Sequence, residues 1–465
     1  MDTTRTEIDS FGPIEVPADA LWGAQTARSL HFFAIGTQQM PLQIVHALGW
    51  VKWAAAGVNA QLQLLDAVKA TAIADAALQV AAGELDAEFP LSVWQTGSGT
   101  QSNMNVNEVI ASRASQVLGG GVGARRLVHP NDEVNLGQSS NDVFPSAMHL
   151  AAVLQTRRLL LPALTELHAA LVRQAGAFAG IVKIGRTHLQ DATPVTLGQE
   201  FGAYAAQLAY CERAIVHALE AVHALAIGGT AVGTGLNTHP EFGARVAAML
   251  ADRLQLPFVQ ADNLFAAMAG HEALVGLHGG LRMLAIALTK IANDIRLMGS
   301  GPRAGLGELR LPQNEPGSSI MPGKVNPTQV EALTMVCIQV MGHDVAVGMA
   351  ASQGQFELNV YKPLIALNVL DSIRMLADAM RSFARHCVSG IEVDTAQMEA
   401  NLQGSLMLVT ALAPHIGYDR AAEIAKRAHA QGTPLRAAAL ELGYVSAAQF
   451  DAWVEPMKRV GSPPV

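Results

Sequence analysis

The segment Gly317–Pro327, with the sequence GSSIMPGKVNP, constrains this chain more than any other stretch. Three prolines (Pro316, Pro322 and Pro327) and two glycines lie within a dozen residues, so a shaped loop is predicted in place of a helix or strand. Asn326 suits the cap of a following helix, and Pro327 suits its first position. The loop thus brings two hydroxyls, an ammonium and an amide to a helix N-terminus, where free N–H groups favour negative charge. The segment predicts an anion site that contains a candidate nucleophile or base.

A phosphate-binding Walker loop is the obvious alternative for a segment with two glycines and a lysine. That motif has the pattern G-x-x-x-x-G-K-[ST]. Here five residues separate Gly317 from Gly323, and Val325 follows Lys324. The Walker interpretation is therefore excluded.

Composition indicates a large, weakly charged protein. The chain has 465 residues, and a prior of about 150 residues per domain suggests about three domains. Charged residues make up only 15% of it, below the usual quarter or so. Sparse charge and abundant alanine predict helices with several buried faces, as at the centre of an oligomer. The net charge of −8 and the lack of a basic run argue against a nucleic-acid partner.

The three cysteines, Cys211, Cys337 and Cys387, are widely spaced and form no CxxC pair. An odd number at such spacings fits buried thiols in a reducing cytoplasm better than disulfides or a zinc site. Three cysteines are also enough for an iron–sulfur cluster, but Cys337 and Cys387 lie in apolar, helix-like runs. We therefore expect neither a metal nor another cofactor.

No targeting or membrane segment is expected. The first fourteen residues carry early charges and have no apolar signal core. The longest uncharged stretch, residues 221–240, is interrupted by glycines, two histidines and an asparagine, so it is too polar to span a bilayer. These features predict a soluble, cytoplasmic protein without a membrane partner.

Apolar periodicity predicts a mainly helical chain in three parts. Residues 1–138 should form a mixed, mostly helical domain, with helices over 41–65 and 68–82 and another that ends near residue 118. Residues 139–390 should form long bundled helices, one of them capped by Thr193 and Pro194 after a loop at 185–191. Glycine and proline breaks over 391–465 predict a small C-terminal helical domain.

Four polar loops interrupt these apolar helices, at residues 94–103, 129–142, 185–191 and 317–326. They are rich in Ser, Thr, Asn and Gln and carry few bulky groups. Any one of them is explained by cap and turn chemistry alone. Four on one helical scaffold favour a shared anionic ligand that is held mainly by neutral donors.

The motifs in these loops closely resemble class II fumarate hydratase of the fumarase/aspartase superfamily, from about Arg5 to near the C-terminus. The departures are peripheral, at residues 31–33 and 460–465. The resemblance implies a three-domain, mainly α fold whose long helices form a twenty-helix core in a homotetramer. The matching motifs are TGSGTQSNMN at 96–105, HPND at 129–132, SSND at 139–142, GRTH at 185–188, GTGLN at 233–237 and the 317–327 segment.

The resemblance also implies an activity and a role for each motif residue. The reaction is the reversible hydration of fumarate to L-malate in the tricarboxylic acid cycle, at sites that three subunits share. Ser318 resembles the base that removes the malate C3 proton, and His188, backed by Glu331, resembles the residue that handles water. The residues that resemble substrate donors are Ser98, Thr100, Ser139, Ser140, Asn141, Thr187, Ser319, Lys324 and Asn326. The residues that resemble a second dicarboxylate site are Arg126, His129, Asn131 and Asp132.

Physical chemistry is consistent with these implied roles. Removal of the C3 proton leaves an aci-carboxylate with a second negative charge, which Lys324 and preorganised donors would stabilise. Glu331 lies about one turn into the helix and could fix the tautomer of a histidine from another segment. An unaided serine is a poor base, so Ser318 needs loop N–H groups and Lys324 to stabilise its alkoxide.

Two alternatives remain open from the sequence. Aspartate ammonia-lyase shares the fold and the 317–327 loop, but it typically has Gln at the position of His188 and Thr at that of Ser140. A non-catalytic relative, such as superfamily members recruited as lens proteins, is the second, although Ser318, Lys324 and Asn326 are intact. An assay with fumarate, malate and aspartate separates all three readings.

Overall fold

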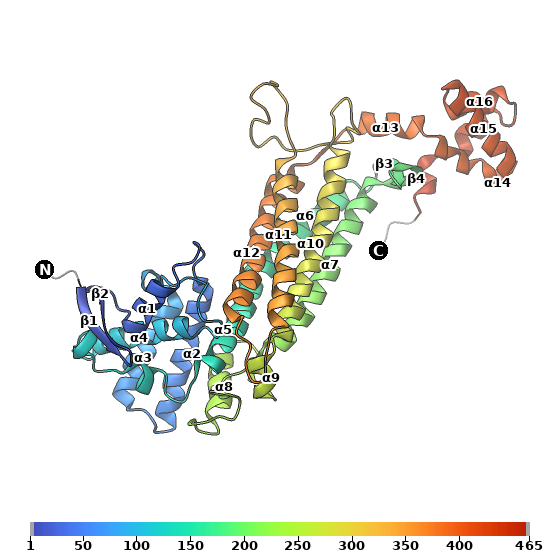
Figure 1. Ribbon diagram of the computed structural model, residues 1–465. Coiled ribbons are helices and arrows are strands. Elements are labelled where there is room, and N and C mark those ends of the chain that lie inside the picture. The colour runs from blue at the N-terminus through green and yellow to red at the C-terminus, as the bar shows by residue number, and fades with distance from the viewer. Residues whose placement is uncertain (1–3, 462–465) are drawn as a thin grey trace. The chain divides into compact units, whose positions relative to one another are not determined.

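The computed structural model describes residues 4–461 and is mainly helical, which confirms the predicted fold class (Figure 1). Within these residues the strands form four two-stranded sheets. The chain divides into two compact units that alternate along the sequence. Unit 1 comprises Met1–Leu161, Arg213–Ala285 and Ile338–Leu376, and unit 2 comprises Pro162–Glu212, Ile286–Cys337 and Ala377–Val465. The predicted division after residues 138 and 390 stays a prediction.

Unit 1 contains the N-terminal hairpin and the helices that follow it. Its complete elements are β1 (Thr4–Asp9), β2 (Gly12–Pro17), α1 (Ala24–Phe32), α2 (Leu42–Gln61), α3 (Ala67–Ala82), α4 (Thr100–Val117), α5 (Ser140–Gln155), β5 (Ala224–Leu225), α8 (Phe242–Leu254), β6 (Val259–Gln260) and α9 (Leu264–Ala269).

Unit 2 contains a long hairpin and the C-terminal helices. Its elements are β3 (Val182–Thr187), β4 (Gln190–Thr196), β7 (Leu309–Arg310), β8 (Glu392–Val393), α13 (Thr395–Gly404), α14 (Ala413–Ile416), α15 (Tyr418–Gln431), α16 (Leu435–Glu441) and α17 (Ala447–Trp453), with all but the first residue of α6 (Leu161–Ala177). Four long helices contribute residues to both units: α7 (Leu197–Val222), α10 (Glu272–Met298), α11 (Thr328–Ala351) and α12 (Lys362–His386).

The core of unit 1 forms around α2 and α3, close to the predicted helices at 41–65 and 68–82. Helix α2 is apolar on nearly every side, and Ile44, Leu48 and Val51 are fully buried. Helix α3 begins where the Asp66 carboxylate accepts two backbone N–H bonds, and it ends at Gly83 with a φ of 81°. Asp and Gly at these two positions are common helix start and stop signals, so the sequence predicted both ends.

The segment after α6 differs from its prediction. Residues 185–191 were expected to form a loop, with Thr193 and Pro194 opening a helix, but both residues lie in strand β4. The real cap of α7 is Thr196, whose hydroxyl accepts the Gln199 N–H while the Gln199 side chain accepts the Thr196 N–H. This reciprocal pair, with its partners three positions apart, is a capping box, and it places the start of α7 after the strand.

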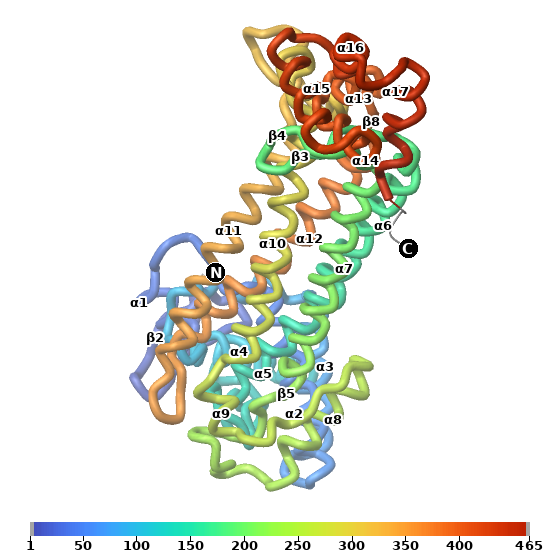
Figure 2. The backbone as a smooth tube through the Cα atoms, turned by 90° about the vertical axis from the view of Figure 1, so that its right-hand side faces the viewer, coloured from blue at the N-terminus to red at the C-terminus, as the bar shows by residue number. Residues whose placement is uncertain are grey.

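The C-terminal helices of unit 2 enclose a small apolar core, and the prediction that residues 391–465 form a separate domain stays a prediction. Leu412, Ile424 and Ala438 are fully buried there. Ile184 of β3 belongs to the same cluster, and Figure 2 shows β3 and β4 beside these helices. The hairpin is therefore held on one face by the C-terminal core.

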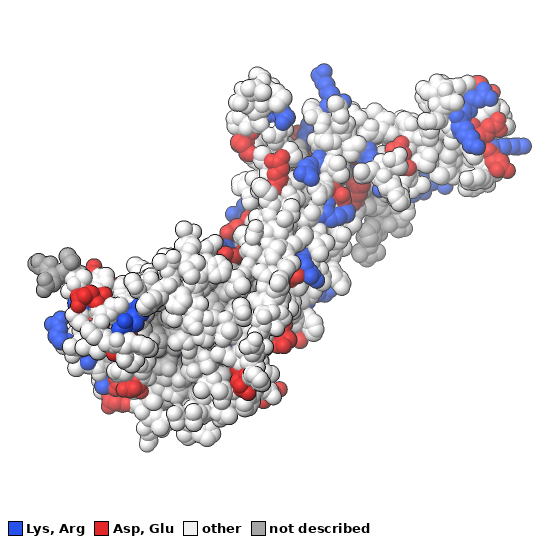
Figure 3. All heavy atoms as spheres, viewed as in Figure 1, with Lys and Arg blue, Asp and Glu red and all other residues white. Residues whose placement is uncertain are grey.

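Among the long helices α11 is the poorest in charge, with only Glu331 and Asp344. In the view of Figure 3 charged side chains gather near α15 and α16 and near the N-terminal hairpin, and others are scattered over the long helices. On α11, Met335, Ile338, Val345 and Met349 are each more than 60% exposed. By length and composition α10 and α11 could cross a membrane, which is weak support for a span because core helices of soluble proteins pass the same test.

Candidate active site

Two of the predicted loops meet in unit 1 through a chain of hydroxyls. The Thr100 hydroxyl lies 2.9 Å from the Ser98 hydroxyl and 2.7 Å from the Ser140 hydroxyl. Thr100 opens α4 and Ser140 opens α5, so both hydroxyls lie at helix N-termini. Unpaired N–H groups at such ends favour anions. These three residues of the 94–103 and 129–142 loops therefore lie together in one chain, and their role as substrate donors stays a prediction.

Glycines allow the first of these loops to pack this closely. A Cβ on Gly97 would lie 1.3 Å from the Val360 carbonyl oxygen, and one on Gly99 would lie 2.3 Å from the Phe144 ring. Gly99 also has a φ of 76°, a conformation that disfavours other residues. The TGSGT motif is therefore required by backbone packing as well as by its hydroxyls.

The start of α5 is held by a buried carboxylate. Ser139 caps the helix, and Asp142 completes a capping box by accepting the Ser139 N–H at 2.9 Å. The other Asp142 oxygen accepts the N–H groups of Gly228 and Thr230. Burial raises the pKa of Asp142, while these N–H bonds oppose the shift. Asn141 donates to the Ala231 carbonyl, so the same 228–231 turn braces two candidate substrate donors.

Sequence reasoning missed a buried lysine beneath this loop. Lys52 of α2 is fully buried and donates to the side chains of Asn135 and Gln138, each at 2.9 Å. Burial lowers its pKa to about 7, and the charge of Asp142 opposes that shift. A lone lysine inside an apolar helix was the available signal, since buried charges need polar partners.

The loop of Gly317–Pro327 in unit 2 folds around Ser318. The Ser318 Oγ accepts the backbone N–H groups of Ile320 at 3.3 Å and Met321 at 3.2 Å. A Cβ on Gly317 would lie 2.3 Å from the Lys324 carbonyl oxygen, so glycine is required where the loop closes. Loop N–H groups therefore surround the hydroxyl, as a serine base needs.

Lys324 and Asn326 brace the same loop. The Lys324 ammonium donates to the side-chain Oδ1 of Asn326 at 2.8 Å, and the Asn326 side-chain Nδ2 donates to the Gly317 backbone carbonyl at 2.8 Å. The side chain of Asn326 thus points back into the loop and does not cap the helix as predicted. Helix α11 begins at Thr328, after Pro327.

Thr187 and His188 lie at the exposed tip of the β3–β4 hairpin. Thr187 pairs with Gln190, so His188 and Leu189 form a two-residue turn with φ values of 56° and 58°. Two positive φ values define a type I′-like turn, which usually contains Asn and Gly. The left-handed conformation costs other residues roughly 1–2 kcal/mol each.

The single chain does not join all the predicted catalytic groups. Among residues 4–461 no hydrogen bond or ion pair connects His188, Glu331 and Ser318 with one another. All three belong to unit 2, and Glu331 and Ser319 are exposed. The predicted pairing of His188 with Glu331 stays a prediction.

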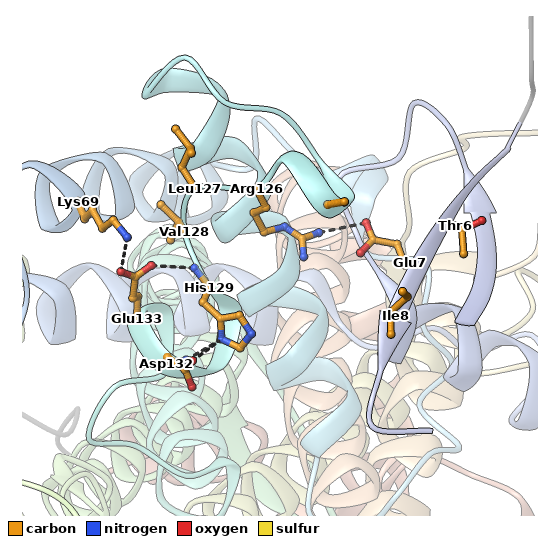
Figure 4. A pocket seen from close by; sticks show the side chains of 12 residues that line it. Thr6, Glu7, Ile8, Lys69, Arg126, Leu127, Val128, His129, Asp132 and Glu133 are labelled. Atoms are coloured by element: carbon orange, nitrogen blue, oxygen red, sulfur yellow. Dashed lines mark hydrogen bonds and ion pairs between the residues drawn. The ribbon is translucent and has the colours of Figure 1, made fainter. Parts of the chain in front are cut away.

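The predicted second site corresponds to a cavity of about 440 Å³ in unit 1 (Figure 4). Arg126, His129 and Asp132 line it, whereas Asn131 is not among the lining residues. Arg126 donates to Glu7 at 3.2 Å, and His129 Nδ1 lies 3.2 Å from the Asp132 carboxylate. An anion would have to compete with these carboxylates for the basic groups.

Comparisons with known proteins agree with this fold and these loops. A family model described as lyase matches residues 12–342, and one described as fumarase C C-terminus matches residues 408–459. The class II fumarate hydratase of Chromobacterium violaceum is 64% identical over 454 residues, 98% of each chain. That of Thermosynechococcus vestitus is 61% identical over 451 residues, 97% of each chain.

Solved structures give the same result. The class II fumarase of Schistosoma mansoni is 47% identical, with a TM-score of 0.96 over 98% of this chain and 99% of that one. Fold and loops together define a lyase of the fumarase type. At the level of sequence identity the assignment is narrower: the chain belongs to the class II fumarate hydratase family.

Proposed function

We propose that the protein catalyses the reversible hydration of fumarate to L-malate by general acid/base catalysis through an aci-carboxylate intermediate. The observation that carries the mechanism is Ser318, whose Oγ accepts two N–H groups of its own loop. An alkoxide at this position would be stabilised in the same way as the oxyanions of other enzymes. Ser318 removes the C3 proton, and His188 handles the water with support from Glu331.

The remaining motif residues bind the two carboxylates of the substrate in this proposal. The ammonium of Lys324 balances the second negative charge of the aci-carboxylate, and Asn326 holds that ammonium at 2.8 Å. Charge stabilisation that grows in the transition state accelerates the reaction, whereas uniform binding does not. The neutral donors are Ser98, Thr100, Ser139, Ser140, Asn141, Thr187 and Ser319.

Purified protein should interconvert fumarate and L-malate without added metal and should leave aspartate unchanged. Among the described residues no group of three or more His, Cys, Asp or Glu side chains is arranged to hold a metal ion. Absorbance of fumarate in the ultraviolet, measured before and after treatment with a chelator, tests this directly. Activity that disappears with chelator and returns with iron would contradict the mechanism, and deamination of aspartate would contradict the substrate.

The same proposal includes a homotetramer whose active sites draw loops from three subunits. The hydroxyl chain lies in unit 1, and the Ser318 loop and His188 hairpin lie in unit 2. Met335, Ile338, Val345 and Met349 are exposed apolar residues on α11, a helix that also carries Glu331, His343 and Asp344. Apolar patches of this kind mark interfaces, and the three polar residues favour a protein partner over a lipid bilayer.

Replacing Ile338 with Glu should break the assembly and abolish activity together. Ile338 is 65% exposed in the single chain, so its side chain is free to pack against another copy. A glutamate there would lose its hydration in a packed interface. Light scattering and the ultraviolet assay measure the two effects on one sample. Tyr418→Glu, at a residue 81% exposed on α15, is the control that should remain tetrameric and active.

A stable monomer with full activity, whether of the unmodified protein or of Ile338→Glu, would contradict active sites shared between subunits.

A cytoplasmic location and a role in the tricarboxylic acid cycle belong to the proposal too. The reaction itself and three buried, free cysteines, which fit a reducing compartment, support this part of the proposal.

We also propose that Arg126, His129, Asn131 and Asp132 form a second dicarboxylate site. Loss of fumarate binding at that cavity in Arg126→Gln would support this site.

A further inference from the structure

A buried ion cluster lies at the base of the hairpin that carries His188. Glu308 is fully buried and accepts two parallel bonds from Arg186, at 2.7 and 3.0 Å. The Lys183 ammonium, also buried, lies 3.4 Å from the same carboxylate and 2.9 Å from Glu200. Asn401 of α13 donates a further bond to Glu308 at 3.2 Å. The Glu308 carboxylate therefore connects two residues of β3 to helix α13, whose Asn401 lies 93 positions after Glu308 in the sequence.

The pairing of the hairpin is irregular beside this cluster. Ile184 pairs with Pro194 and Arg186 with Asp191, so two residues of β4, Ala192 and Thr193, lie opposite the single residue Gly185 of β3. This is the pattern of a β-bulge in β4, and bulges often re-aim side chains next to functional sites. Both cations that contact Glu308 come from β3, one on each side of this irregular pairing.

Gly185 is required for the bulge, since a Cβ there would lie 2.6 Å from the Thr193 carbonyl oxygen. On the opposite face Ile184 packs into the C-terminal core. The strand is thus fixed from both sides, directly before the turn.

The turn itself lacks comparable support. His188 and Leu189 both have positive φ without being glycine, and the Leu189 side chain is 73% exposed. Among residues 4–461 no hydrogen bond from another segment reaches the His188 side chain. The sequence of the tip does not favour its own conformation, so the base of the hairpin must restrain it.

We propose that Glu308 is a positioning residue for His188: by binding both Arg186 and Lys183 of β3, it holds the hairpin tip in the geometry that catalysis needs. This inference rests on the proposed role of His188. Glu308 is fully buried behind the strand and acts through Arg186, so it is not a catalytic residue itself.

The electrostatics of the cluster support this role. Burial would raise the pKa of Glu308, but the Arg186 hydrogen bonds and the charges of Lys183 and Arg186 outweigh it and lower that pKa. The Glu308 carboxylate is therefore ionised at neutral pH and accepts hydrogen bonds from both terminal nitrogens of the Arg186 guanidinium. A bidentate pair of this kind fixes orientation as well as distance.

Two substitutions test the proposal with L-malate as substrate. Glu308→Gln keeps the shape of the side chain but removes its negative charge. Arg186→Lys keeps the positive charge but removes the bidentate geometry of the guanidinium. Both should lower kcat, by up to about 10²-fold for Glu308→Gln, with little change in KM, because misplacement of a catalytic group acts on the chemical step. Circular dichroism and light scattering verify folding and assembly.

The matched control is Glu166→Gln. Glu166 also forms a bidentate pair, with Arg385 at 2.6 and 3.0 Å, but this pair is more exposed and contacts neither strand of the hairpin. Its loss should leave kcat and KM at the values of the unmodified protein. If Glu308→Gln does not fold, the comparison of Arg186→Lys with Glu166→Gln carries the test.

A second substitution at the turn separates positioning from general stabilisation. Leu189→Gly gives the turn a residue that accepts positive φ without strain. Alone it should leave kcat unchanged, and combined with Glu308→Gln it should raise kcat several-fold over Glu308→Gln. A role limited to holding the C-terminal helices through Asn401 predicts no such rescue.

Unchanged kcat in both Glu308→Gln and Arg186→Lys would overturn the proposal, as would the lack of any rescue by Leu189→Gly. His188→Asn distinguishes this failure from failure of the proposed site. If His188→Asn is inactive while Glu308→Gln is fully active, only the positioning role is wrong. If His188→Asn is itself fully active, the assignment of His188 is wrong and the positioning role falls with it.

Discussion

Ser318→Ala should bind dicarboxylate nearly as well as the unmodified protein and yet turn over at least ~10²–10⁴-fold more slowly, the usual loss for a missing general base. Binding should survive because Lys324 and the neutral donors remain. Only one atom that matters to the chemistry is removed, the Oγ that accepts the N–H groups of Ile320 and Met321. Calorimetric titration with fumarate measures binding, and steady-state kinetics measures turnover.

Exchange of the malate C3 proton with solvent makes the assignment sharper. A protein without its C3 base should lose this exchange together with turnover, which nuclear magnetic resonance in heavy water detects. Ser319→Ala is the matched control in the same loop, and it should raise KM while kcat is largely kept, the pattern of a lost binding contact. Near-normal C3 exchange in Ser318→Ala would transfer the role of base to another residue, with His188 the first candidate.

The loop geometry explains why this serine was accessible to sequence reasoning. Pro322 restricts the backbone, Gly317 and Gly323 permit the close approach and the positive φ that the loop needs, and the contacts of Ser318 are made with residues two and three positions away. The helix ends at Asp66 and Gly83 were predictable for the same reason, since capping uses neighbouring residues. Where the determining contacts are short in sequence, pattern and structure agree.

Contacts that are distant in sequence were not predictable. Glu308 looks like an ordinary surface carboxylate until the fold brings Arg186 to it from 122 positions away. Lys52 is an isolated charge in an apolar helix until it meets Asn135 and Gln138, more than eighty positions further on. No local pattern encodes such pairs, and each is decided by tertiary packing.

The β3–β4 hairpin shows a different limit. Strand β4 carries a bulge opposite Gly185, and the turn contains His188 and Leu189 where Asn and Gly would be the usual signal. The apolar alternation that marks a strand is lost across a bulge, so a loop was the natural prediction. Sequence reasoning therefore failed at a segment where local propensity and the observed conformation disagree, which is common at functional sites.

His188→Asn should lower turnover by ~10²–10⁴-fold, as loss of an acid/base group does, whereas Glu331→Gln should lower it less. If Glu331 acts only by orienting and polarising His188, it has nothing left to support once the imidazole is gone. The double variant should then resemble His188→Asn alone. Fully additive losses would show that the two residues act independently.

The relation between these two residues also tests the assembly. No hydrogen bond joins His188 and Glu331 within the described residues, and in the proposed assembly the pair forms between copies. Co-expressed His188→Asn and Glu331→Gln chains would then assemble some sites with one intact copy of each residue. Such mixed tetramers should recover part of the activity that His188→Asn tetramers lack, beyond the contribution of Glu331→Gln alone. Activity equal to the average of the two separate proteins would place both residues in one chain and contradict a site shared between subunits.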